Sequence, residues 1–468
     1  MRRIRGWFQN GKRLQSQKNK ILFFSFFGFI FLLLFAIVFL NPSISMDEIW
    51  VYQFARRILY HQLPYRDYGM ITTPLKAQMD AFILRIFSDQ LYVLRLIAFI
   101  TALLNVFLFY LISLHLKLSR NKTLILIFLF LFSFSQFPIN NYSWLSVFWL
   151  SLVLLLLLGE KKLMQAFLIG FFTSMLLLTK QNIGIYLMIG LFFYFLKFRY
   201  RFGLYFILGF LIGLLPEVAY FYYNHALGDF LSIFYRVILT FYQERVFFHS
   251  PFSFILPTCL LVMIGYFFIS FQEEKKTCLF LFAIIALGFA FPIFDIVHFL
   301  FSIPFLVLFF LYLFSIKNKI IAYCLIFFFC FRGFCWFLMV QESSLSSLNH
   351  FKMIPIENAT RKNMETVVDY IKRMQSIGKH CYVIDFTNIM FDILLNRFSF
   401  KYDSMMRESL GKEGETEIIN VIKNDKTAIV ILLKKYSNKQ QQTIITKYVR
   451  ENLHPVPSFS KNYLVFTH

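Results

Sequence analysis

A series of long apolar runs governs what this chain can fold into. Runs of about 15–25 residues with few charges are long enough to cross a bilayer as helices. Such a run recurs about eleven times, near 21–40, 91–115, 123–138, 144–158, 163–179, 183–196, 202–222, 252–271, 277–294, 299–316 and 320–340. The sequence therefore predicts an α-helical polytopic membrane protein with about eleven transmembrane helices.

The composition favours the same class of protein. Of the 468 residues, 58% are hydrophobic and 15% are charged, whereas about half of a soluble domain is apolar. The net charge of +22 would suggest nucleic-acid binding in a soluble protein. Here the basic residues cluster in short connectors between apolar runs, which is typical of cytoplasmic loops. We therefore expect the protein to associate with a lipid bilayer and not with nucleic acid.

The distribution of basic residues predicts the orientation of the chain. They gather before the first run and in alternate connectors, near 117–122, 161–162, 197–201, 275–276 and 317–319. Because Lys and Arg are retained on the cytoplasmic side, we expect a multi-pass protein of the cell inner (plasma) membrane with a cytoplasmic N-terminus. The first run is longer than the apolar core of a signal peptide and is read as an uncleaved span. An odd number of spans then places the C-terminus outside.

The last part of the chain has a different character. Helical patterns over 364–375, 415–424 and 438–452 alternate with strand patterns over 381–385, 427–433 and 463–466. Such alternation predicts a small C-terminal α/β domain. The predicted division is a transmembrane domain over 1–344 and an extracytoplasmic α/β domain over 345–468.

The connector 41–90 is the most informative segment, and at about fifty residues it is too long for a simple link. Amphipathic helices are predicted over 49–60 and 75–87, lying along the membrane surface. Asp47 and Glu48 follow the first apolar run directly. Adjacent carboxylates there are costly unless they are solvated, paired or used. The simplest interpretation is that both stabilise the N-terminus of the first of these helices.

The wider pattern resembles the GT-C superfamily of membrane glycosyltransferases, which includes protein O-mannosyltransferases and bacterial enzymes that modify lipopolysaccharide from polyprenyl-phosphate sugars. The segments that carry the resemblance are Asp47-Glu48, Pro-Tyr-Arg-Asp-Tyr at 64–68 and Thr-Pro-Leu at 73–75, with weaker similarity at 92–96, 141–144, 179–182 and 295–298. The resemblance covers about 40–340. It implies a GT-C-like fold for the transmembrane domain, with 41–90 as the first external loop.

The resemblance also implies an activity, namely transfer of a sugar from a polyprenyl-phosphate carrier to a cell-envelope lipid, glycan or protein, with inversion at the anomeric carbon. Asp47 would accept the proton of the acceptor hydroxyl, and Glu48 would orient Asp47 or the acceptor. The departing phosphate needs nearby cations. The candidates for binding the donor phosphate or the substrate are Arg66, Asp67, Lys76, Lys180, Asp295, His298 and Arg332.

Metal ions and cofactors are not expected. No Asp-x-Asp lies near Asp47, in contrast to the metal-dependent oligosaccharyltransferase branch of the superfamily. The six cysteines form no Cys-x-x-Cys and no Cys/His spacing of a zinc site.

Other interpretations stay open at this point. Lys180 suits an ordinary loop lysine, Asp295 and His298 are spaced to pair with one another, and Arg332 suits a side chain that extends to the headgroups. For the whole protein the alternative is a polytopic transporter or lipid-carrier flippase. Its usual sign, helices broken at matching places in two halves, is absent from the sequence. A membrane scaffold without enzymatic activity is a further alternative.

Overall fold

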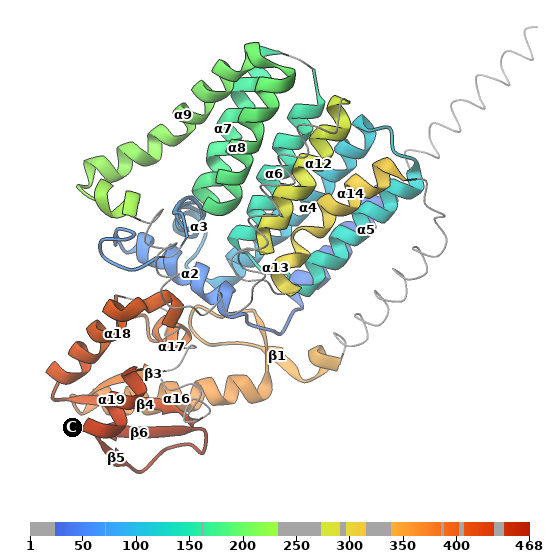
Figure 1. The fold of residues 1–468 in the computed structure, drawn as a ribbon. Helices are drawn as coiled ribbons and strands as arrows, with labels where there is room; N and C mark the ends of the chain where they lie inside the picture. The colour runs from blue at the N-terminus through green and yellow to red at the C-terminus, as the bar shows by residue number, and fades with distance from the viewer. Residues whose placement is uncertain are drawn as a thin grey trace, which may run out of the picture.

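A computed structural model describes residues 24–70, 72–160, 162–232, 273–290, 296–314, 338–384, 388–401, 407–434 and 444–468. A bundle of long helices lies on one side of the molecule and a smaller α/β unit on the other, with α2 and α3 between them (Figure 1). The predicted span 252–271, most of the predicted span 320–340, and the candidates Asp295 and Arg332 lie outside the described residues.

The helices of the bundle follow the apolar runs of the sequence. They are Phe24–Phe39, α4 (Leu91–His115), α5 (Arg120–Gln136), α6 (Tyr142–Leu158), α7 (Leu163–Thr179), α8 (Gln181–Phe198), α9 (Tyr200–Tyr223), α12 (Glu274–Leu287), α13 (Ile296–Leu300) and α14 (Ile303–Leu313). Among the described residues, three helices (α4, α8 and α9) are long and apolar enough to cross a membrane, and Phe24–Phe39, α6, α7 and α14 are shorter apolar helices.

Two predicted spans differ from the helices observed in the structure. The run 299–316 is divided between α13 and α14, because Pro304 lies in the first turn of α14, where its missing N–H leaves no helical bond unmade. Within the described part of the run 277–294, the α-helix ends at Leu287 and a 3-10 turn follows over Gly288–Ala290. Hydrophobicity alone does not encode these interruptions.

Glycines allow α7 and α9 to pack very closely. A Cβ atom on Gly170 would lie 2.0 Å from the backbone oxygen of Phe206, and one on Gly209 would lie 2.0 Å from that of Phe167. Only a residue without a side chain tolerates such an approach. The contact fixes α9 against the bundle.

The connector 41–90 forms α2 (Met46–Leu59) and α3 (Leu75–Ile86), so both predicted helices exist. The expectation of an amphipathic helix with one open face is wrong for α2. Every residue over 48–57 is buried, because the C-terminal part of the chain covers the side of α2 that faces away from the bundle (Figure 1).

The C-terminal part contains the predicted helices and strands. The strands form a mixed four-stranded sheet of order β3-β4-β6-β5. β3 (His380–Ile384) pairs parallel with β4 (Ala428–Leu433), and β6 (Tyr463–Thr467) pairs antiparallel with β4 and with the short β5 (His454–Val456). The helices are α16 (Asn358–Ser376), α17 (Asn388–Leu394), α18 (Arg407–Asn424) and α19 (Ile444–Asn452); β1 (Ser343–Leu345) and β2 (Pro355–Glu357) form a separate antiparallel pair.

One hydrophobic core joins the sheet to the connector. Val383 and Ile431, whose side chains point to the same face of the sheet, belong to one buried cluster with Ile49 and Tyr52 of α2 and Ala81 of α3. Strand residues of alternate parity point to the opposite face, where they form a second core with α18 and α19. The C-terminal unit and α2 therefore share apolar contacts and do not merely touch at their surfaces.

Candidate active site

At the start of α2, two residues with adjacent carboxylates differ in their burial. Ser45 caps the helix, since its Oγ accepts a hydrogen bond from the Asp47 N–H at 3.2 Å. Glu48 is fully buried, whereas Asp47 remains partly exposed. Of these two residues, Asp47 is therefore the less enclosed.

Arg95 of α4 explains why Glu48 is buried. Its Nε and Nη2 donate to the two carboxylate oxygens of Glu48 at 2.9 and 3.1 Å. The same guanidinium donates to the backbone oxygens of Asn41 at 2.7 Å and Ser43 at 3.0 Å. A bidentate ion pair of this kind fixes the relative orientation of the two side chains and also compensates their charges. Arg95 thus anchors the chain that enters α2, next to Asp47.

A second buried ion pair lies on α3. Lys76 and Asp80, one helical turn apart, form a salt bridge, and Asn140 donates to Asp80 Oδ2 at 3.0 Å. Burial lowers the pKa of Lys76 and raises the pKa of Asp80, because leaving water disfavours both charged forms. The attraction between the two groups opposes both shifts.

Lys180 lies between α7 and α8 and reaches the same corner of the bundle. Its Nζ donates to Ser143 Oγ at 3.0 Å and lies 5.0 Å from the ring centre of Phe289 and 5.9 Å from that of Phe301. The ring of His298 on α13 stands edge-on to Phe301, with centroids 6.5 Å apart. An ammonium group over aromatic faces is stabilised by their electron density.

The structure therefore brings three of the sequence candidates together. Residues 140–143, which lead into α6, contact the Lys76–Asp80 pair through Asn140 and Lys180 through Ser143. His298 adjoins this group through Phe301. The shared corner is called the 140–143 corner below.

Arg66 and Asp67 lie elsewhere. Arg66 Nε donates to Asp67 Oδ1 at 2.9 Å and its Nη1 donates to the backbone oxygen of Asn224, just beyond α9, at 3.1 Å. Asp67 Oδ2 accepts from the Leu63 N–H at 2.7 Å, and the hydrogen bond from Arg66 lowers the pKa of Asp67. The pair stabilises the turn at 63–68 against the end of α9, with Arg66 half exposed.

The sequence did not reveal the contacts of several residues in this region. Asp80 had a local signal, the four-residue spacing from Lys76 on a predicted helix. Arg95 lies in the segment 92–96 that carries part of the resemblance, but nothing local indicated its partners, because its acceptors lie at Asn41, Ser43 and Glu48, about fifty residues away in the chain. Glu217 of α9 accepts a hydrogen bond from Gln78 of α3 at 2.7 Å.

Comparisons with known proteins give a structural relative. No family model and no curated protein sequence matches the chain. Its fold is similar to that of ArnT from Cupriavidus metallidurans bound to undecaprenyl phosphate, with a TM-score of 0.59, 12% identity, and coverage of 95% of this chain and 97% of ArnT. For ArnT in the apo state the TM-score is 0.60 at 12% identity, with 96% and 98% covered.

At this level of identity the similarity concerns the fold. The resemblance predicted from the sequence is therefore confirmed as a likeness in fold to ArnT, over nearly the whole chain. The chain is an integral membrane protein by its helices and by this fold.

Proposed function

We propose that this chain transfers a sugar from a polyprenyl-phosphate carrier to a cell-envelope acceptor, a lipid, glycan or protein, on the extracytoplasmic face of the membrane. The observation that carries the proposal is the likeness in fold, over 95% of the chain, to a protein crystallised with undecaprenyl phosphate. The alternating basic connectors support a cytoplasmic N-terminus, which puts α2, α3 and the C-terminal unit outside.

Asp47 is assigned as the general base. Its carboxylate takes the proton of the acceptor hydroxyl while the hydroxyl oxygen bonds to the anomeric carbon from the face opposite the carrier. The bond between that carbon and the phosphate oxygen breaks, and the polyprenyl phosphate leaves as a monoester with one more negative charge. The product sugar therefore has inverted anomeric configuration. Glu48, held by Arg95, orients α2 rather than meeting the acceptor.

The lysines of the 140–143 corner are assigned to the donor phosphate. Lys76 and Lys180 are almost fully buried, and charges act strongly where water is excluded. A phosphate bound between them would share Lys76 with Asp80. His298 is proposed to extend this group, and Asp295 and Arg332 remain candidates for the same role. Arg66 and Asp67 are proposed to shape the turn beside α9 that borders the site.

Replacement of Asp47 tests the assignment. In Asp47→Asn the side chain keeps its shape and cannot take a proton, so turnover should fall about 10²–10⁴-fold. Because Ser45 is the helix cap, the loss in stability should stay within about 1 kcal/mol. The assay follows release of undecaprenyl phosphate from undecaprenyl-phosphate sugars mixed with envelope extract and the purified full chain. Thermal unfolding of the same samples reports stability.

Two controls complete the test. Asp369→Asn makes the same change on an exposed position of α16 and should leave turnover unchanged. A nucleotide sugar should give no transfer. A fully active Asp47→Asn protein would remove the catalytic assignment, and movement of the carrier across vesicles without sugar transfer would favour the flippase alternative.

A further inference from the structure

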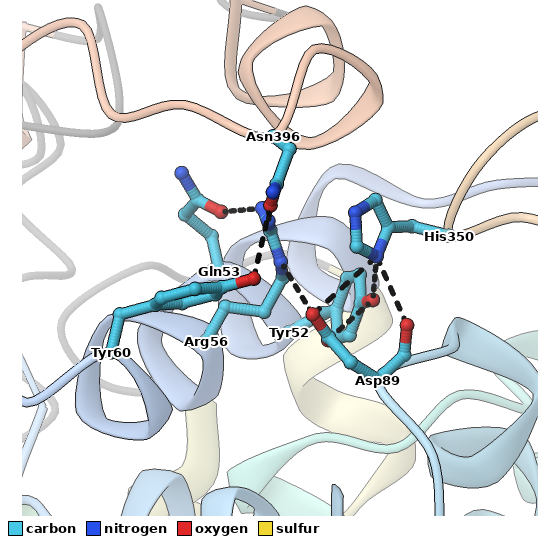
Figure 2. Close-up of polar contacts among 7 residues, drawn as sticks. All are labelled: Tyr52, Gln53, Arg56, Tyr60, Asp89, His350 and Asn396. Carbon is cyan, nitrogen blue, oxygen red and sulfur yellow. Dashed lines mark hydrogen bonds and ion pairs between the residues drawn. The ribbon is translucent and has the colours of Figure 1, made fainter.

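The C-terminal unit contacts the C-terminal end of α2, the helix that contains Asp47. Figure 2 shows Arg56 of α2 between Asp89 and Asn396. Arg56 Nη2 donates to Asn396 Oδ1 at 2.5 Å, Nη1 donates to Gln53 Oε1 at 3.1 Å, and Nε pairs with Asp89 Oδ2 at 3.5 Å. Arg56 is completely buried, so its contact with the C-terminal unit is a fixed part of the fold.

Arg57 repeats the arrangement on the next residue. Its Nη2 donates to the backbone oxygen of Phe400 at 2.5 Å and its Nη1 to Gln62 Oε1 at 2.6 Å. The guanidinium also lies 4.8 Å from the ring centre of Phe398. Two consecutive arginines of α2 therefore bind one short segment, 396–400, of the C-terminal unit.

A second segment of the C-terminal unit binds α2 through His350. The Tyr52 hydroxyl donates to Asp89 Oδ1 at 2.9 Å and lies 3.1 Å from His350 Nδ1, which is 3.0 Å from the backbone oxygen of Asp89 (Figure 2). The Leu91 N–H donates to the backbone oxygen of His350 at 2.9 Å. The start of α4 is thus tied to the same contact.

Burying adjacent arginines is costly unless each finds acceptors in fixed directions. Here one acceptor of each arginine lies 340 or more positions away in the sequence, so the angle of α2 depends in part on the C-terminal unit. Asp47 lies nine residues before Arg56 on the same helix, about 14 Å along its axis. A tilt of about 5° at Arg56 would move Asp47 by about 1 Å, a shift that can cost about 10²-fold in rate.

We propose that Arg56, Arg57 and the segment 396–400 are positioning residues, through which the C-terminal unit holds Asp47 at the reaction distance. The inference rests on the proposed function and explains why the enzyme carries this unit. It concerns the chemical step and not donor binding, because the lysines of the 140–143 corner contact other elements.

Asn396 offers a matched pair of variants. Its Oδ1 accepts from Arg56 and from the Tyr60 hydroxyl, and its φ of 52° is in the left-handed region. Asn396→Gly removes the acceptor while the backbone stays allowed, and Asn396→Asp keeps the acceptor. We expect kcat to fall about tenfold or more in Asn396→Gly with an unchanged KM for undecaprenyl-phosphate sugar. Asn396→Asp should retain kcat.

A control separates coupling from general loosening of the unit. Asp425 accepts hydrogen bonds from Tyr382 and Thr427, next to β3 and β4 and away from α2. Asp425→Asn should weaken the sheet and leave kcat near that of the unchanged chain. If Asp425→Asn and Asn396→Gly lower kcat equally, the positioning role is overturned.

Hydrogen exchange gives a readout that does not need activity. Amides in the first turn of α2 should exchange several-fold faster in Asn396→Gly than in Asp425→Asn, both in the full-length chain. Faster exchange in a chain that transfers no sugar would keep the coupling and refute the proposed function. Normal exchange and normal kcat in Asn396→Gly, in a chain that does transfer sugar, would refute the coupling alone.

Discussion

Around α2 and α3, the buried arginines and the buried lysines make different kinds of contact. Arg56, Arg57 and Arg95 each donate to two or more acceptors, at least one of which is distant in the sequence. Lys76 instead pairs with Asp80 on its own helix, and Lys180 donates to Ser143 beside aromatic rings.

The difference follows from the shape of the two cations. A guanidinium is a rigid fork that stabilises a fold only when several acceptors are fixed around it. An ammonium is a point charge on a flexible stem, so it can turn from one oxygen to another without disrupting its surroundings. The arginines therefore hold the region together, while the lysines are suited to meet a phosphate. The following experiments examine that division.

The largest expected effect is on folding, from Arg95→Leu. The change leaves Glu48 as a buried charge without its partner and removes the donors to Asn41 and Ser43. Loss of one member of a buried pair costs about 3–5 kcal/mol. We expect little folded protein by size exclusion in detergent, and a much lower unfolding temperature for what remains.

The double variant Arg95→Leu with Glu48→Leu is the control for this effect. Removing both charges should recover part of the stability, because an apolar pair of similar volume replaces a buried ion pair at little cost. If the single Arg95→Leu variant is as stable as the unchanged chain, the proposal that the arginines stabilise the fold while the lysines meet the phosphate is refuted.

A smaller effect, on function instead of folding, is expected from Lys76→Met. The chain should fold, because burial already raises the pKa of Asp80 towards its neutral form and Asn140 still donates to it. The rate of undecaprenyl phosphate release should fall about 10²–10³-fold, as for other lost transition-state donors. Lys372→Met, on the exposed side of α16, should change neither property. A Lys76→Met chain that fails to fold would class Lys76 with the arginines.

The smallest effect is a shift in pH dependence from Asp80→Asn. Burial lowers the pKa of Lys76, and the neighbouring Asp80 carboxylate opposes that shift. If protonated Lys76 binds the phosphate, kcat/KM is retained below its pKa and lost as pH rises through it. Removal of Asp80 lowers this pKa further, so the alkaline loss of kcat/KM should begin at lower pH. A profile that stays in place or moves to higher pH would show that Lys76 does not control it.

The sequence by itself determined where the chain is helical and where it changes character. The runs 91–115 and 163–179 became helices with the same bounds, Leu91–His115 and Leu163–Thr179, and the strand patterns of the C-terminal part became β3, β4 and β6 within a residue or two. These features depend on the period and polarity of neighbouring residues, which are local in the sequence. Asp47 stood out for the same reason, as an acidic residue at a helix start.

Tertiary structure alone decided which charges meet. Glu48 is adjacent to Asp47, yet Glu48 is fully buried against Arg95 while Asp47 is only partly buried. Arg66 and Lys76 belong to one connector, yet one lies against the end of α9 and the other at the 140–143 corner. The C-terminal unit binds Arg56 and Arg57 across more than 300 residues of chain. The free energy of a charge depends on its burial and on the direction of its partners, and both are set by segments distant in sequence.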